Sequence, residues 1–188
     1  MTIHLATRMT TPPGLPDMQP DATAWSAVVP ATGIAVIGAA TIAGAWFFQL
    51  VLDIQPCPLC LEQRYAYYLA RPVALITAAL ARRGAAALLL QALFAVMLIA
   101  LRANAALGVY HAGVEWGFWA GPTDCTGPIK DLGSAGSLLE RLQTEKVVRC
   151  DEVQWRFLGL SLAGYNALIS LAMAALALWG VRRARAID

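Results

Sequence analysis

The sequence predicts an all-α membrane protein: a four-transmembrane-helix bundle with one short and one long loop on its outer side. Of the 188 residues, 59% are hydrophobic and only 14% are charged, and the mean hydropathy is +0.58. A soluble domain usually has about 25% charged and roughly 45–50% apolar residues. Four long apolar stretches complete the prediction, because about 20 apolar residues span a bilayer core. The net charge of +2 is too small to indicate a nucleic-acid partner.

The apolar stretches give the predicted helices their bounds, which are about 27–52, 62–81, 85–109 and 157–181. The second is the nearest to the lower length limit, because Arg71 and Pro72 interrupt it. The first is much longer than the core of a signal peptide, which has about 7–15 apolar residues, so we expect it to be retained. One membrane domain therefore occupies residues 27–181, between a disordered tail (1–26) and a basic tail (182–188).

Basic residues set the expected orientation of these helices. They gather in the first tail, in the turn between the second and third helices, and after the fourth helix: Arg8, Arg82, Arg83, Arg182, Arg183 and Arg185. Because arginine and lysine are enriched on the cytoplasmic side of membranes, both termini should be cytoplasmic. The loops 53–61 and 110–156 should then face outward, where thiols can persist as disulfides.

All four cysteines lie in these two outer loops, at Cys57, Cys60, Cys125 and Cys150. The first two form a C-x-x-C pair, a spacing that often lowers the pKa of one thiol. Two such dithiols can pass two electrons between them by thiol–disulfide exchange. A zinc site is disfavoured, because the second pair is widely spaced and no histidine lies between its members. Covalent haem would need a histidine in place of Leu61. We therefore predict redox chemistry without a metal, with purely structural disulfides as the open alternative.

Three segments together resemble the disulfide bond formation protein B family, DsbB. They are PCPLCLEQR, the wide pair Cys125 and Cys150, and CDEVQWRFLGL from Cys150 to Leu160. The resemblance covers most of residues 30–180 and follows the order helix, C-x-x-C, two helices, long cysteine loop, helix. It implies an inner-membrane enzyme, a quinone-dependent protein-disulfide oxidoreductase with periplasmic cysteine loops. Such an enzyme reoxidises a periplasmic DsbA-like thioredoxin-fold protein and passes two electrons to ubiquinone or menaquinone, which supports disulfide formation in exported proteins.

The resemblance also implies a separate role for each cysteine. Cys57 and Cys60 match the membrane-proximal pair that quinone reoxidises, and Cys60 is the sulfur that interacts with the quinone ring. Cys125 matches the cysteine that the soluble partner attacks. Cys150 matches the cysteine that exchanges with Cys57.

Two further side chains are candidates for binding the quinone. Arg64 follows Cys60 by about one helical turn, where a guanidinium can bind a quinone carbonyl and stabilise a thiolate, and it matches the family's quinone-proximal arginine. His111 lies near the family's histidine after the third helix, with a solvated interfacial histidine as the equal alternative. Arg71 should lie near mid-bilayer, where a polar contact, a bound lipid or a deeper pocket remain open.

Aromatic residues gather near the predicted membrane edges, at Trp46, Phe47, Phe48, Trp116, Phe118 and Trp119. An interfacial belt is the favoured interpretation of this pattern, and an aromatic quinone pocket is the alternative. Within the long loop, Ser137 and Glu140 fit a capping box that opens a short helix.

Two other functions remain possible at this point. A vitamin K epoxide reductase-like protein is also a four-helix redox bundle, but its loop cysteines precede the C-x-x-C pair, whereas here they follow it. A non-catalytic membrane scaffold would use the same disulfides only to stabilise a surface that binds a partner.

Overall fold

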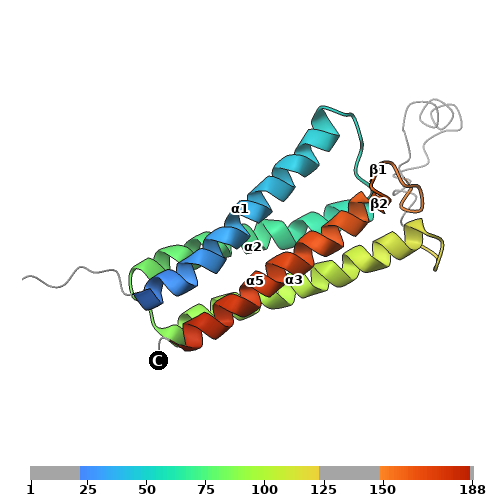
Figure 1. Cartoon of the computed structure of the whole chain (residues 1–188). Helices are drawn as coiled ribbons and strands as arrows, with labels where there is room; N and C mark the ends of the chain where they lie inside the picture. The colour runs from blue at the N-terminus through green and yellow to red at the C-terminus, as the bar shows by residue number, and fades with distance from the viewer. Residues whose placement is uncertain (1–21, 123–148, 187–188) are drawn as a thin grey trace, which may run out of the picture.

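The computed structural model describes residues 22–122 and 149–186, which form an elongated bundle of helices (Figure 1). The elements are α1 (Ala22–Leu50), α2 (Pro58–Arg82), α3 (Ala87–Glu115), β1 (Arg156–Phe157), β2 (Leu160–Ser161) and α5 (Leu162–Arg185). Helices α1 and α3 each pack against both α2 and α5. Towards its C-terminal end, α1 leans away from the other helices. Residues 1–21 of the predicted N-terminal tail, Cys125 and the short helix near Ser137 lie outside the described residues. Residues 22–26, which were predicted to belong to that tail, are instead the first residues of α1.

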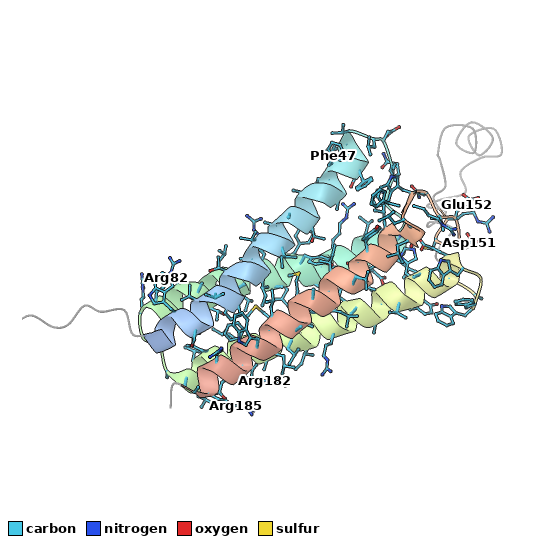
Figure 2. The ribbon with its side chains drawn as sticks, viewed as in Figure 1. Phe47, Arg82, Asp151, Glu152, Arg182 and Arg185 are labelled. Carbon is cyan, nitrogen blue, oxygen red and sulfur yellow. The ribbon has the colours of Figure 1, made fainter. Side chains whose placement is uncertain are left out.

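Three helices in the described part of the chain are long and apolar enough to cross a membrane. The spans are Trp25–Leu50, Ala87–Glu115 and Leu162–Arg185. The prediction of a helical, multi-pass membrane protein is confirmed to this extent, while α2 does not meet the same criterion. Figure 2 shows Arg82, Arg182 and Arg185 at one end of the bundle and Asp151 and Glu152 at the other.

Helix α2 begins at Pro58 rather than at the predicted residue 62. Proline suits the first helical position, because its φ angle is already helical and its missing N–H would have no partner there. Cys57 is the N-cap residue, and its sulfur accepts a hydrogen bond from the backbone N–H of Cys60 at 3.2 Å. Cys60 therefore lies in the first turn of a helix instead of in a loop.

Helix α5 also starts at a different residue, Leu162 instead of the predicted 157. The residues before it form a two-stranded antiparallel hairpin, in which Arg156 pairs with Ser161. The turn of this hairpin contains Leu158 and Gly159, whose φ angles are 49° and 83°. Such angles stop a helix from beginning here. Ser161 then caps α5 by accepting a hydrogen bond from the N–H of Gly164.

The interior of the bundle is built largely from small residues, which let the helices approach closely. At Gly180 of α5, an added Cβ atom would overlap the ring of Phe94 on α3. At Gly108 of α3, it would lie 3.0 Å from the backbone nitrogen of Ala167 on α5. Both positions therefore require glycine for packing rather than for backbone flexibility.

A buried polar network joins α2, α3 and α5 near the middle of the bundle. The Tyr67 hydroxyl lies 2.6 Å from Asn166 Oδ1 and 2.9 Å from Ser170 Oγ. Asn104 donates to the same Ser170 oxygen at 2.9 Å. Because buried polar groups are costly unless they are paired, these bonds fix the mutual rotation of the three helices. Helix α1 is not part of this network.

Candidate functional site

The first site element is the pair of cysteines at the start of α2. Cys57 and Cys60 are free thiols, and their sulfurs lie 2.8 Å apart. Cys57 is only 2% exposed. Because Cys57 is the N-cap and Cys60 lies in the first turn, both sulfurs stay at the same end of the helix. The pair is therefore close enough to form or open a disulfide with little backbone movement.

The surroundings of Cys57 favour its thiolate. They lower its pKa from 9.0 to about 5, and the largest cause is the hydrogen bond from the Cys60 thiol. Burial opposes this shift, whereas the hydrogen bond and charge of His111 and the backbone N–H of Cys60 add to it. At neutral pH Cys57 is thus a thiolate, which is the form that attacks disulfides and leaves from them.

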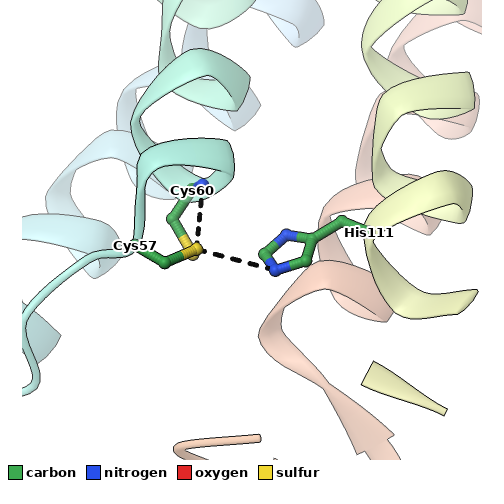
Figure 3. A group of neighbouring side chains, drawn as sticks. All are labelled: Cys57, Cys60 and His111. Carbon is green, nitrogen blue, oxygen red and sulfur yellow. Dashed lines mark hydrogen bonds between the residues drawn. The ribbon is translucent and has the colours of Figure 1, made fainter. Parts of the chain in front are cut away.

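His111 of α3 faces this pair across the bundle (Figure 3). Its Nε2 lies 3.6 Å from the Cys57 sulfur, and its Nδ1 lies 3.0 Å from Nε2 of Gln63. The imidazole is only 2% exposed, which rules out the alternative of a solvated interfacial histidine. Gln63, which the sequence analysis did not single out, fixes the orientation of the ring. Gln63 could have been predicted from the sequence, because it follows Cys60 by three residues and therefore lies on the same face of α2.

Glu115 is the second residue that sequence reasoning missed. Its side chain is 7% exposed, and one carboxylate oxygen lies 4.0 Å from His111 Nε2. The other oxygen, Oε2, is buried without a hydrogen-bond partner. The predicted end of the third helix at residue 109 placed Glu115 in a loop. Because α3 continues to Glu115, the i, i+4 spacing from His111 brings the two side chains together.

Arg64 connects α2 with the end of α1. Its Nη1 donates to Gln49 Oε1 at 2.8 Å, and its guanidinium carbon lies 5.6 Å from the centre of the Trp46 ring. This cation–π arrangement and the hydrogen bond orient the guanidinium. Trp46, a residue of the predicted belt, therefore contacts a candidate site residue.

A cavity of about 630 Å³ lies between α1 and the other helices, and most of the side chains described above line it. Its polar lining includes Cys57, Cys60, Gln63, Arg64, His111 and Glu115. Much of the remaining wall is apolar and comes from α1 and α5. This volume lies within the range of pockets that hold small organic ligands, roughly 300–1,000 Å³.

The aromatic residues of the predicted belt divide between two environments. Phe48 lines the cavity, and its ring centre lies 4.9 Å from that of Trp155. Trp116, Phe118 and Trp119 are exposed beyond the end of α3. Phe48 thus contributes to the pocket wall, while Trp116, Phe118 and Trp119 have the exposure expected of interfacial anchors.

Cys150 joins the same buried region as the C-x-x-C pair. It is disulfide-bonded and 1% exposed. It belongs to one buried cluster with Cys57, Leu59 and Val114, against which Cys60 also packs. Three of the four predicted site cysteines are therefore close neighbours, and Cys125 lies outside the described residues. Arg71 is exposed on α2 and does not line the cavity.

The ligand atoms of Cys57, Cys60 and His111 lie within 4.8 Å of one another, as a metal site would require. The distance between the two sulfurs does not fit such a site. Tetrahedral zinc with bonds of about 2.3 Å to sulfur holds two thiolates roughly 3.8 Å apart, whereas these sulfurs are separated by 2.8 Å. The geometry favours a dithiol that cycles with its disulfide.

Comparison with known proteins gives a consistent result. The family model described as disulfide bond formation protein DsbB matches residues 29–180. A disulfide bond formation protein B from Azoarcus sp. is 29% identical over 152 residues, covering 75% of this chain and 84% of that protein. The protein of the same name from Marinobacter nauticus is 31% identical over 144 residues, covering 71% and 79%. Another from Xanthomonas oryzae is 30% identical over 146 residues, covering 76% and 81%. No solved structure gives a significant match.

Proposed function

This chain belongs to the disulfide bond formation protein DsbB family, and from that membership we propose that it is a quinone-linked thiol oxidase. It accepts two electrons from a reduced DsbA-like thioredoxin-fold protein and transfers them to a membrane quinone. The electrons pass first through Cys125 and Cys150 and then through Cys57 and Cys60. The observation that carries the proposal is the buried C-x-x-C pair, which shares a cluster with Cys150 and also lines a largely apolar cavity.

Cys57 takes part in both steps of the exchange between the two cysteine pairs, as a disulfide sulfur in the first and as a thiolate in the second. When Cys57 and Cys60 form a disulfide, attack by the Cys150 thiolate on Cys57 releases Cys60. Attack by the Cys125 thiolate on Cys150 then forms the Cys125–Cys150 disulfide and releases Cys57, which leaves the C-x-x-C pair reduced. In the reduced pair Cys57 has its pKa lowered to about 5, so the thiolate is present at neutral pH to re-form the disulfide.

The residues around the cavity fit a quinone. Arg64 offers N–H donors to a carbonyl oxygen, His111 borders the cavity beside the reacting sulfur, and the apolar walls of α1 and α5 can cover a ring and the start of a prenyl chain. A bound quinone supplies an acceptor for two electrons and two protons. This acceptor is needed because a DsbA-like dithiol has a reduction potential near −120 mV, which makes its disulfide hard to regenerate by exchange alone.

The proposed topology places the site at the periplasmic side of a bacterial inner membrane. Helix α2 has 25 residues, about 38 Å at 1.5 Å per residue, which is long enough to cross together with the three apolar helices. The arginine-rich end of the bundle is then cytoplasmic. We propose the same side for both chain termini. The loops that carry the cysteines face the periplasm.

Replacement of Cys60 by serine tests this function. The purified full chain is given a reduced DsbA-like protein and a quinone, and oxidation of the partner is followed by thiol titration. We expect quinone-dependent oxidation to be lost, while the partner still forms a mixed disulfide with Cys125. A scaffold would keep partner binding in both proteins and would show no quinone-dependent oxidation in either. Undiminished oxidation by Cys60→Ser would refute the proposal.

The partner-facing half of the relay needs a separate test. Cys125→Ala should abolish the trapped mixed disulfide with the partner and leave the reaction of reduced Cys57 and Cys60 with quinone intact. Absorbance of the quinone, measured with the chemically reduced variant, reports the second half alone. If Cys125→Ala formed the mixed disulfide with the partner in undiminished yield, the role assigned to Cys125 would be wrong.

A further inference from the structure

We infer that Glu115 is a positioning residue for proton transfer, acting through His111 during oxidation of the C-x-x-C pair. The inference rests on the proposed function and adds to it a local store for one proton. Glu115 lies at the cavity wall, and its side chain is only 7% exposed. Its Oε2 atom is buried and has no hydrogen-bond partner. A buried carboxylate with one oxygen left without a hydrogen bond is costly, so a positive charge or a proton at this place would lower that cost.

The geometry of His111 supplies the connection. Its Nδ1 is engaged by Gln63, which leaves Nε2 as the ring nitrogen that faces the reacting thiol. That nitrogen lies 3.6 Å from the Cys57 sulfur and 4.0 Å from a Glu115 oxygen. When His111 takes up the proton of Cys57, its Nε2–H lies between the Cys57 sulfur and the Glu115 carboxylate, which stabilises the imidazolium. The imidazolium also carries a proton on Nδ1, and Gln63 accepts it through its amide oxygen after a half-turn of the amide.

The chemistry requires such a group. When Cys57 and Cys60 are oxidised, one S–S bond forms, two electrons leave the sulfurs, and two protons must reach the two quinone oxygens. Cys57 is already a thiolate at neutral pH, so its proton is no longer on sulfur when the electrons leave. The largely apolar cavity limits delivery from bulk water. An imidazolium at His111 beside the Glu115 carboxylate keeps that proton next to the acceptor and returns it when the quinone is reduced.

Other charged and titratable groups also face Glu115. They are Cys57 and Cys60 from the start of α2 and Arg156 from β1, and the Ser161 hydroxyl lies beside the carboxylate. Arg156 is exposed, so solvent screens its charge. His111 is the group that lies between the carboxylate and the reacting sulfur, and for this reason we assign the proton to it.

The test compares the full chain with Glu115→Gln, which keeps the shape of the side chain and removes its charge. Quinone reduction by the chemically reduced protein is measured over a series of pH values. We expect the rate at neutral pH to fall by roughly ten- to a hundredfold, the range found when a carboxylate that orients a metal-binding histidine is removed. The decrease in rate at alkaline pH should also begin at a lower pH in the variant, because the imidazolium no longer has the negative charge of Glu115 beside it.

Two further variants separate proton transfer from a structural role. Glu115→Asp keeps a carboxylate and should recover part of the rate and the wild-type position of the alkaline fall. Glu62→Gln, which removes an exposed carboxylate on α2 outside the cavity, should behave as the unaltered protein does. A thermal unfolding curve for each variant checks that the bundle is intact.

The outcomes are distinct. If Glu115→Gln keeps the rate and the pH profile, the inference is wrong and the oxidase function stands. If the glutamine and aspartate variants lose the same activity with no shift of the profile, Glu115 has only a packing role, and the inference is again wrong. If the unaltered protein reduces no quinone at any pH, the proposed function fails, and the inference fails with it.

Discussion

Removal of the Cys60 thiol should raise the pKa of Cys57 more than any other single substitution in the site. The Cys60 thiol is the largest cause of the lowered pKa, and burial of Cys57 opposes it. With a pKa of about 5, roughly 99% of Cys57 is thiolate at pH 7. If Cys60→Ala returns the pKa to 9.0, the fraction falls to about 1%, a hundredfold loss. The shift of about four pH units corresponds to about 5 kcal/mol between the two protonation states.

The assay is a pH titration of thiolate absorbance in the ultraviolet. Cys125 and Cys150 are replaced by serine so that only the C-x-x-C pair is observed in the reduced protein. Cys60→Ser is the matched control, because its hydroxyl can still donate to the thiolate and should keep part of the shift. His111→Gln should cause a smaller rise, since His111 contributes less than Cys60. A midpoint that stays near 5 in Cys60→Ala would refute this explanation of the Cys57 environment.

Three other predictions address ligand binding, packing and pH dependence. Arg64→Met should raise the KM for quinone by roughly tenfold or more, the effect of losing one charged hydrogen bond, and steady-state kinetics at several quinone concentrations would show whether kcat changes instead. Gly180→Val should lower the free energy of unfolding by about 1–3 kcal/mol, because the new side chain would overlap the Phe94 ring; chemical denaturation in detergent measures it. In the reduced protein, the stability that Cys57 contributes is fully present above pH 9.0 and is lost as the pH falls through about 5. Unfolding midpoints should therefore rise with pH in this window, and should do so less in Cys57→Ser.

The parts of the fold that could be predicted from sequence are those that depend on length and local spacing. Apolar runs of sufficient length indicate the membrane helices, and the C-x-x-C spacing indicates the reactive pair. The hairpin before α5 escaped this reasoning, because Phe157, Leu158 and Leu160 also continue an apolar helical run. What ends the run is the backbone at Leu158 and Gly159, where φ is positive. A hydrophobicity pattern carries no information about that.

The residues missed in the site depend on contacts between helices. Gln63 and Glu115 belong to the site because they lie close to His111. The fold brings His111 next to Cys57, although His111 and Cys57 are far apart in sequence. Prediction of such a contact requires the rotation of α2 and α3 about their axes. That rotation is fixed by the buried bonds of Tyr67 and Asn104 in the middle of the bundle. Local spacing could have paired His111 with Glu115, but only with the correct end of α3.

The helices differ in how firmly they are fixed within the bundle, and this difference determines what each contributes to the site. Helices α2, α3 and α5 are joined by a buried polar network and by close glycine contacts, so the thiols and His111 lie on a rigid support. Helix α1 lies outside that network and leans away at the end where the cavity forms. Near the site, Arg64 reaches across to Gln49 of α1. In the proposed function the same guanidinium binds a quinone carbonyl, so a bound quinone would be linked to the position of α1 through Arg64.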